Sequence, residues 1–324
     1  MTGEFPTRRQ AALLVAAFAV LGLLPQALSR TLPDIAFPLW AADRMQHGAR
    51  LYVDILEINP PLFIWLDLPL TWLARVTGLG SITWYRIATS LLLFASLGGC
   101  WWALNRALED HPLAYRRLLW LAAAFSLLLL PRLDWGEREH LSLALTLPYI
   151  LLGIARARGR SVPRGGAILS GLAAGVGIAF KPHFVLVWVG REVAARVGSE
   201  RHGQSRGSAR TGVIARAEGP KQSGRLRHRH SGESRNPAHR SSVRWAPAFA
   251  GATAWETILV PLVCIAYLAA VVVIHPEYFH LVREVGWAYS RFLRNSVWIT
   301  TLQGHGSAIV LGAVIVALAL WDIP

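Results

Sequence analysis

Long hydrophobic stretches separated by short polar connections run along most of this chain, and they are its main structural signal. A helix needs about 20 apolar residues to cross a hydrocarbon core about 30 Å thick. Runs near this length recur at approximately 11–28, 61–77, 84–104, 118–131, 141–155, 166–180, 184–198, 256–274 and 306–321. Because lipid offers backbone polar groups no partner, the pattern predicts an all-α, polytopic transmembrane helical bundle.

Lys and Arg residues decide how many of these runs cross the membrane. Connections rich in them stay in the cytoplasm, and the richest are Arg8/Arg9, Arg106/Arg116/Arg117, Arg156/Arg158/Arg160/Arg164 and the tract after Arg196. If the run 61–77 spanned, the first two clusters would lie on opposite sides. We therefore predict about eight spans with a cytoplasmic N-terminus, and residues 30–83 form one large extracytoplasmic loop.

The residues of the run 61–77 agree with this topology. The run begins at the pair Pro60-Pro61 and contains Asp67, Pro69 and Arg75, which are unfavourable on a lipid-facing span. They are acceptable on a helix in the membrane interface, so the loop 30–83 is expected to carry juxtamembrane helices. The other outer segments are then 132–140, the turn 181–183 and 275–305.

One segment, 199–254, differs in composition from the rest of the chain. It is rich in Arg, Ser, Gly, His and Ala, which cannot build a core and predicts a basic, disordered cytoplasmic insertion between 1–198 and 255–324. Its wording RHSGESRNP and WAPAFAGAT resembles the translation of interspersed palindromic repeats common in proteobacterial genomes. An arm that binds anionic headgroups or RNA, or a soluble domain, is the other interpretation.

Both ends of the chain and its cysteines bear on processing. The apolar run 11–28 is long and followed by a poor cleavage site, so we expect an uncleaved first span. Cys100 and Cys264 both lie inside apolar runs, which predicts no disulfide framework. The chain stops at Pro324, at the close of a span, and we expect a truncated reading frame. Although the net charge is +14, its concentration in the insertion argues against a nucleic-acid partner.

The stretch from Asp34 to Trp65 concentrates carboxylates, aromatics and a Pro pair beside the first span, and it is the place to look for chemistry. Asp34 has two interpretations. It is either a first-turn acid of the helix predicted by the spacing of Phe37, Trp40 and Met45, or a general base or metal ligand facing an acceptor in the outer leaflet. Spacing alone leaves both open.

The order of residues in this stretch carries a family resemblance. Asp34, an amphipathic segment ending at Gly48, then Leu51-Tyr52-Val53-Asp54 and Asn59-Pro60-Pro61-Leu62-Phe63-Ile64-Trp65 resemble the first outer loop of GT-C glycosyltransferases. The pattern is most similar to bacterial aminoarabinose and mannosyl transferases related to protein O-mannosyltransferases. Asp34 matches their first acidic position, whereas Ile35 stands where many relatives have Glu. This departure weakens a two-carboxylate metal site.

The resemblance implies a GT-C-like fold and an inverting enzyme of the bacterial inner membrane. It would transfer a sugar from a polyprenyl-phosphate donor to a lipid or glycan acceptor on the extracytoplasmic face, among membrane lipids. Asp34 would be the catalytic residue, and Asp54 and Glu57 are secondary candidates for substrate binding. A divalent cation is compatible with this chemistry, but the sequence requires none.

A second polar group lies at 132–140. Glu137, Arg138 and His140 either close the active cavity opposite Asp34 or anchor the connection in the interface through local ion pairs. A zinc site is not expected at His140, because no further His or Cys spacing supports it. In the turn 181–183, Lys181 and His183 either bind the donor phosphate or reach to lipid headgroups.

Two other functions fit parts of the pattern. A transporter or flippase of a lipid-linked precursor would also need charge and a basic cavity, but transporters usually show internal repeats and polar residues near the centres of their spans. The spans of this chain are apolar through their middles, with charges at the ends. A non-functional, truncated remnant is compatible with the glycosyltransferase interpretation. The enzyme is the favoured prediction.

Overall fold

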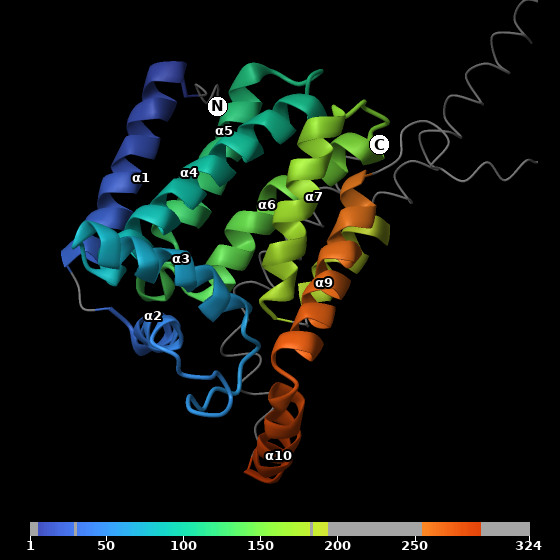
Figure 1. Cartoon of the computed structure of the whole chain (residues 1–324). Helices are drawn as coiled ribbons and strands as arrows, with labels where there is room; N and C mark the ends of the chain where they lie inside the picture. The colour runs from blue at the N-terminus through green and yellow to red at the C-terminus, as the bar shows by residue number, and fades with distance from the viewer. Residues whose placement is uncertain (1–5, 29–30, 182–183, 194–254, 293–324) are drawn as a thin grey trace, which may run out of the picture.

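The computed structural model describes residues 6–28, 31–181, 184–193 and 255–292, and within these ranges the regular structure is helical. A bundle of neighbouring helices forms the body of the molecule, and three further helices gather at one end of it (Figure 1). The bundle consists of α1 (Arg8–Leu28), α4 (Ser81–Ala107), α5 (Leu113–Ala124), α6 (Arg138–Ala157), α7 (Arg164–Ala179) and α9 (Trp255–Ile274). The end helices are α2 (Pro33–Gln46), α3 (Leu62–Thr77) and α10 (Glu277–Phe292).

Four of the described helices, α1, α4, α6 and α9, are long and apolar enough to cross a membrane, and α7 is a shorter apolar helix. The prediction of about eight spans is therefore met only in part. Run 118–131 is divided between α5 and a π-helical turn, Phe125–Leu129. Only residues 185–193 of the run 184–198 form a described helix, and the run 306–321 lies outside the described residues.

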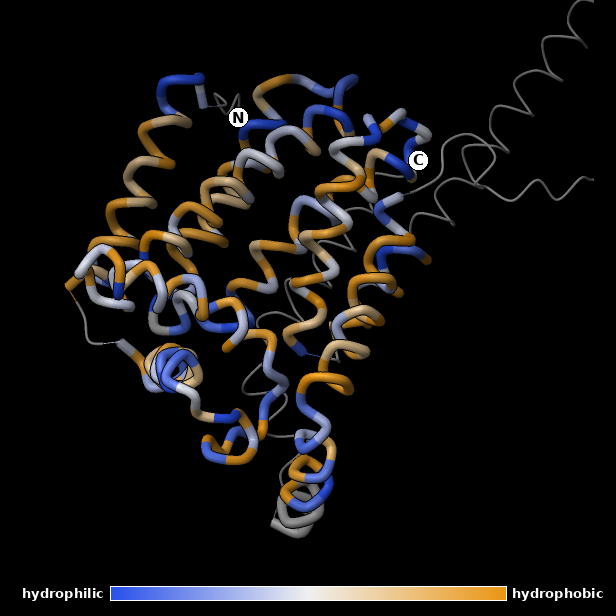
Figure 2. Tube along the Cα trace, viewed as in Figure 1, coloured by the Kyte–Doolittle hydropathy of each residue, from blue (hydrophilic) through white to orange (hydrophobic). Residues whose placement is uncertain are grey.

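The connections of the bundle separate into two ends. The start of α1, the α4–α5 connection and the α6–α7 connection meet at one end, called here the basic end. There Arg160 pairs with Asp110 at 3.1 Å, and Arg117 donates to the carbonyl oxygen of Pro6 at 3.4 Å. The opposite end, called the α2 end, carries α2, α3 and the α5–α6 connection. Hydrophilic residues mark both ends, and hydrophobic ones follow the helices between them (Figure 2). The predicted cytoplasmic connections preceding residue 194 thus lie together.

Small residues let α7 lie close to its neighbours α6 and α9. A Cβ atom at Gly171 would lie 2.6 Å from the Cα atom of Glu256, and one at Gly175 would lie 2.6 Å from the Cβ atom of Val263. Close approach through glycine is the usual way that helices pack in a membrane. The glycines of this helix therefore serve helix packing.

Helix α3 exposes apolar residues and buries polar ones. Leu66, Trp72 and Val76 are 43%, 56% and 62% exposed, whereas Asp67 and Thr71 are buried. The side chain of Gln46 joins α2 to this helix by donating to the Leu68 carbonyl oxygen at 2.6 Å. An outward apolar face is what a helix needs where it meets lipid. The arrangement agrees with an interfacial position for 61–77.

The predicted insertion 199–254, His183 and the part of the outer loop 275–305 after residue 292 lie outside the described residues. The earlier part of that loop forms the amphipathic helix α10. Cys100 and Cys264 are both free cysteines, as expected from their positions in apolar runs.

Candidate functional site

Asp34 lies in the first turn of α2, at the end of the bundle where α2 and α3 gather. The helix begins at Pro33, and its N-cap residue, Leu32, makes no side-chain capping bond. The Asp34 carboxylate is exposed, and its position suits the positive end of the helix dipole. The structure is thus compatible with both sequence interpretations, because a first-turn acid can also act on a ligand.

The α5–α6 connection brings the second predicted group of residues to the same end. It contains the short 3-10 helix Arg132–Asp134, and Gln26 of α1 donates to the carbonyl oxygen of Arg132 at 2.6 Å. The hydroxyl of Tyr85 on α4 donates to the carbonyl oxygen of Gly136. These two bonds attach the connection to two helices of the bundle and fix the start of α6.

Glu137 lies within electrostatic range of four charged side chains from three segments, and we call these five residues the mouth cluster. They are Asp34, Asp134, Glu137, Arg138 and Lys181. Burial raises the pKa of Glu137, and the charges of Asp134 and Asp34 raise it further, while Arg138 and Lys181 oppose the rise. Glu137 is the N-cap residue of α6, but its side chain makes no capping bond. Its carboxyl group is therefore available to a ligand.

Lys181 supplies a cation at the end of α7. Burial and the neighbouring Arg138 lower the pKa of Lys181, whereas Glu137 and Asp34 raise it. Its ammonium group pairs with Glu139, and both side chains are partly exposed. A phosphate would have to compete with this carboxylate for Lys181, while Arg138 makes no hydrogen bond or ion pair to the described part of the chain. Together the two residues place two cations beside the carboxylates of the mouth cluster.

His140 differs from its predicted role. It is only 4% exposed, and its Nδ1 atom accepts the Gly136 N–H at 3.0 Å. The Nε2 atom lies 2.8 Å from the carbonyl oxygen of Leu127, which can only accept, so Nε2 carries the proton. Leu127 belongs to the last turn of its helix, where carbonyl groups lack helical partners. His140 therefore joins two backbone segments, and we do not keep it as a substrate ligand.

Asp54 and Glu57 lie in a separate loop. Asp54 accepts the N–H of Arg50 at 2.8 Å, and Glu57 accepts both the backbone N–H and the side-chain amide of Asn59 at 2.7 Å. This loop packs on the start of α10 through Tyr52, whose ring lies 5.0 Å from that of Tyr278. The two carboxylates thus stabilise local turns, and their hydrogen bonds within the described ranges stay inside this loop.

Ile35, which follows Asp34, is 5% exposed and packs in the core with Leu39, Tyr85 and Trp135. A Glu at this position would be buried, so the side chain next to Asp34 is part of the packing. Sequence reasoning did not include Asp134 and Glu139 among the site residues. The density of charge at 132–140 was the signal that could have pointed to them.

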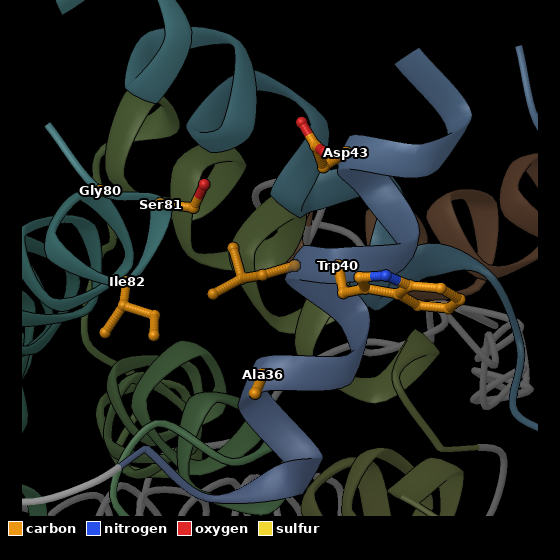
Figure 3. A pocket seen from close by; sticks show the side chains of 7 residues that line it. Ala36, Trp40, Asp43, Gly80, Ser81 and Ile82 are labelled. Atoms are coloured by element: carbon orange, nitrogen blue, oxygen red, sulfur yellow. The ribbon is translucent and has the colours of Figure 1, made fainter. Parts of the chain in front are cut away.

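A shallow hollow of about 330 Å³ lies along α2 beside the start of α4. Residues of the two helices line it from two sides (Figure 3). Its lining is mainly apolar, and the side chains of Trp40, Asp43 and Ser81 bring polar atoms to it. It begins at Ala36, two residues after Asp34. The hollow thus lies along the same helix that carries Asp34.

Within the described ranges, no group of three or more His, Cys, Asp or Glu residues is arranged to hold a metal ion. Comparisons of the chain with protein-family models, with curated proteins and with solved structures found no match.

Proposed function

We propose that this protein is a membrane glycosyltransferase of the GT-C type that transfers a sugar from a polyprenyl-phosphate donor to an acceptor. The observation that carries the proposal is the mouth cluster. Asp34 and the residues 134–138 are about a hundred residues apart in sequence, and Lys181 comes later still. Their carboxylates and cations lie within electrostatic range of Glu137 at one end of an apolar bundle. Ionisable groups at the mouth of such a bundle are expensive unless they are used.

The cluster has the groups that this transfer needs. The exposed carboxylate of Asp34 takes the proton of an acceptor hydroxyl, whose oxygen then attacks the anomeric carbon from the face opposite the phosphate. The bond between that carbon and the phosphate oxygen breaks, and its electron pair leaves with the lipid phosphate. Arg138 and Lys181 stabilise the charge on this leaving group. Attack from the opposite face inverts the configuration of the sugar.

The surroundings of the cluster suit a donor that arrives from lipid. The outward face of α3 is apolar at Leu66, Trp72 and Val76, and the hollow beside α2 has a mainly apolar lining. In the proposed topology, the basic end faces the cytoplasm of a bacterial cell and the α2 end faces outward. The proposed topology has about eight spans, and one of them, the run 306–321, comes after residue 292.

The test of the reaction class is a turnover assay in membranes that contain the protein. A polyprenyl-phosphate-linked sugar is supplied to one sample and the matching nucleotide sugar to another, with membranes lacking the protein as the control. We expect transfer of the sugar only from the first donor, with release of its lipid phosphate and a product of inverted configuration. Turnover of the nucleotide sugar alone, or equal turnover in the control membranes, would rule the proposal out.

A further inference from the structure

A buried carboxyl group lies behind the mouth cluster, on the inward face of α3. Asp67 is 2% exposed, and its Oδ2 atom has no hydrogen-bond partner. None of the ion pairs in the described part of the chain includes it. A charged carboxylate in such a place would cost several kcal/mol, by the order of magnitude for burying an uncompensated charge. The neutral, protonated form avoids this cost.

The neighbours of Asp67 connect it to the site. Phe63 lies one helical turn before Asp67 on the same face of α3, and its ring packs edge-on against that of Tyr85, 6.3 Å away. The Tyr85 phenol lies within electrostatic range of both Asp67 and Glu137. Tyr85 in turn donates its hydroxyl proton to the Gly136 carbonyl oxygen, one residue before Glu137. A single phenol thus stands between the buried acid and the mouth cluster.

We propose that Asp67 is an uncharged acid in the folded protein and acts as a positioning residue, fixing Tyr85 and through it the Gly136–Glu137 part of the mouth cluster. Its role in catalysis rests on the proposed function, but its protonation and its effect on the connection do not. A protonated carboxyl group has one O–H to donate. In the structure the Oδ2 atom of Asp67 makes no hydrogen bond, so its O–H is open to the Tyr85 oxygen, which donates a hydrogen bond to the Gly136 carbonyl oxygen and retains lone pairs.

The other groups around this face do not offer Asp67 a counter-charge. Thr71, one turn further along α3, donates to the Asp67 carbonyl oxygen at 3.2 Å and accepts from Gln46 of α2 at 3.0 Å. Arg75 lies two turns beyond Asp67, where it pairs with Asp43 of α2 at 3.4 Å. From α4, the titratable group that faces Asp67 is Tyr85. Burial accordingly raises the pKa of Asp67 well above its ordinary value.

The test combines a spectroscopic signature with a structural one, both on the full chain in lipid nanodiscs at neutral pH. The infrared carbonyl band of a protonated carboxylic acid is compared in the wild type, Asp67→Asn and Asp43→Asn. We expect Asp67→Asn to remove part of this band and Asp43→Asn, an exposed acid paired with Arg75, to leave it unchanged. A band of equal strength in the wild type and Asp67→Asn would show that Asp67 is ionised and would overturn the proposal.

Hydrogen exchange of the α5–α6 connection tests the positioning. Asn keeps the neutral shape and a donor, so Asp67→Asn should preserve the wild-type protection of 132–138. Asp67→Ala should raise exchange there, and Thr71→Ala, on the same helix face, should raise it only within α3. If Asp67→Ala affects α3 alone, the residue merely packs. If Asp67→Asn raises exchange as much as Asp67→Ala does, the carboxyl is not acting as a neutral donor.

Discussion

Gly136 adopts a φ of +82° and lies against side chains from two other elements. A Cβ atom at this position would lie 3.0 Å from the Cε1 atom of Tyr85 and 3.4 Å from the Cδ1 atom of Ile35. Glycine is the residue that adopts a positive φ without steric cost. The close contact and the backbone conformation together explain why a glycine occupies the position before Glu137.

Gly136→Ala should therefore destabilise the protein by about 1–3 kcal/mol, the usual cost of a left-handed backbone at a residue with a side chain. Thermal unfolding in detergent measures the loss. Gly98→Ala is the matched control, because a Cβ atom at Gly98 meets nothing within 4 Å and its φ is not positive. Equal stability of the two variants would contradict the account of Gly136.

The sequence indicated some residues of the candidate site and not others, for a physical reason. Asp34, Glu137 and Lys181 could be named as candidates because charged groups at the ends of apolar runs are costly unless they serve a purpose. The partners of His140 could not be foreseen. One of them, the Leu127 carbonyl, is available only because the preceding helix ends there in a π turn. Asp67 was noted only as unfavourable on a lipid-facing span, since its inward direction depends on how α3 packs.

At the scale of elements, the hydrophobic pattern predicted where helices lie better than it predicted where they end. The run 61–77 contains the helix α3, and its exposed apolar face agrees with the interfacial position expected from Asp67, Pro69 and Arg75. The run 118–131 is divided, because a π turn follows the end of α5 at Ala124, whereas the run 166–180 coincides with the short helix α7 to within two residues. Such ends depend on contacts with other segments.

A buried charge network joins three helices at the basic end. Glu256, at the start of α9, is fully buried and accepts from the Nε atom of Arg156 at 2.8 Å and from the Nη2 atom at 3.3 Å. The Nη2 atom of Arg191 lies 3.5 Å from the same carboxylate. Paired charges of this kind tolerate burial only while all partners are present.

Glu256→Gln should lower the free energy of unfolding by about 3–5 kcal/mol, because it removes the counter-charge of Arg156 and leaves Arg191 with Glu192 alone. The control is Asp110→Asn, which removes an exposed partner of Arg158 and Arg160 and should cost at most about 1 kcal/mol. Chemical or thermal unfolding of both variants supplies the comparison. If the buried and the exposed replacement cost the same, the network does not hold α9 in place.

His275, a titratable residue between α9 and α10, contacts α3. Its Nε2 atom accepts the indole N–H of Trp65 at 3.2 Å, and its ring lies 5.4 Å from that of Tyr52. Burial lowers the pKa of His275 from its ordinary 6.5, and the charge of Glu277 opposes this effect. The docked state therefore binds the proton less readily than an undocked state does, so acidification below pH 6.5 weakens the contact.

We expect hydrogen exchange in 47–61 and α10, corrected for intrinsic rates, to increase as the pH falls from about 7.5 to about 5, the range in which histidine titrates. His275→Gln should suppress this increase, because a Gln oxygen can accept the Trp65 N–H without titrating. His280→Gln, an exposed neighbour on α10, should behave like the wild type. Persistence of the full increase in His275→Gln would exclude this residue as its origin.

At the scale of the whole molecule, hydrophilic residues mark the two ends of the bundle, the basic end and the α2 end (Figure 2). Gly78, after α3, and Gly159, after α6, are exposed and lie at opposite ends. With the positive-inside rule, a reporter fused at Gly78 should be extracytoplasmic and one fused at Gly159 cytoplasmic. Cytoplasmic activity of the Gly78 fusion would contradict the topology.

The most direct test of the mouth cluster as an active site is turnover of a polyprenyl-phosphate-linked sugar in membranes containing Asp34→Asn, Glu137→Gln or Asp110→Asn. Asp110 is an exposed carboxylate at the basic end, where it pairs with Arg158 and Arg160, so its replacement should leave the rate unchanged. We predict that Asp34→Asn lowers the rate by about 10²–10⁴-fold, the usual contribution of a general base. We also predict that Glu137→Gln changes the pH dependence of turnover on the acidic side, because it removes a carboxyl group of raised pKa that lies within electrostatic range of Asp34. Wild-type turnover by Asp34→Asn would contradict the account.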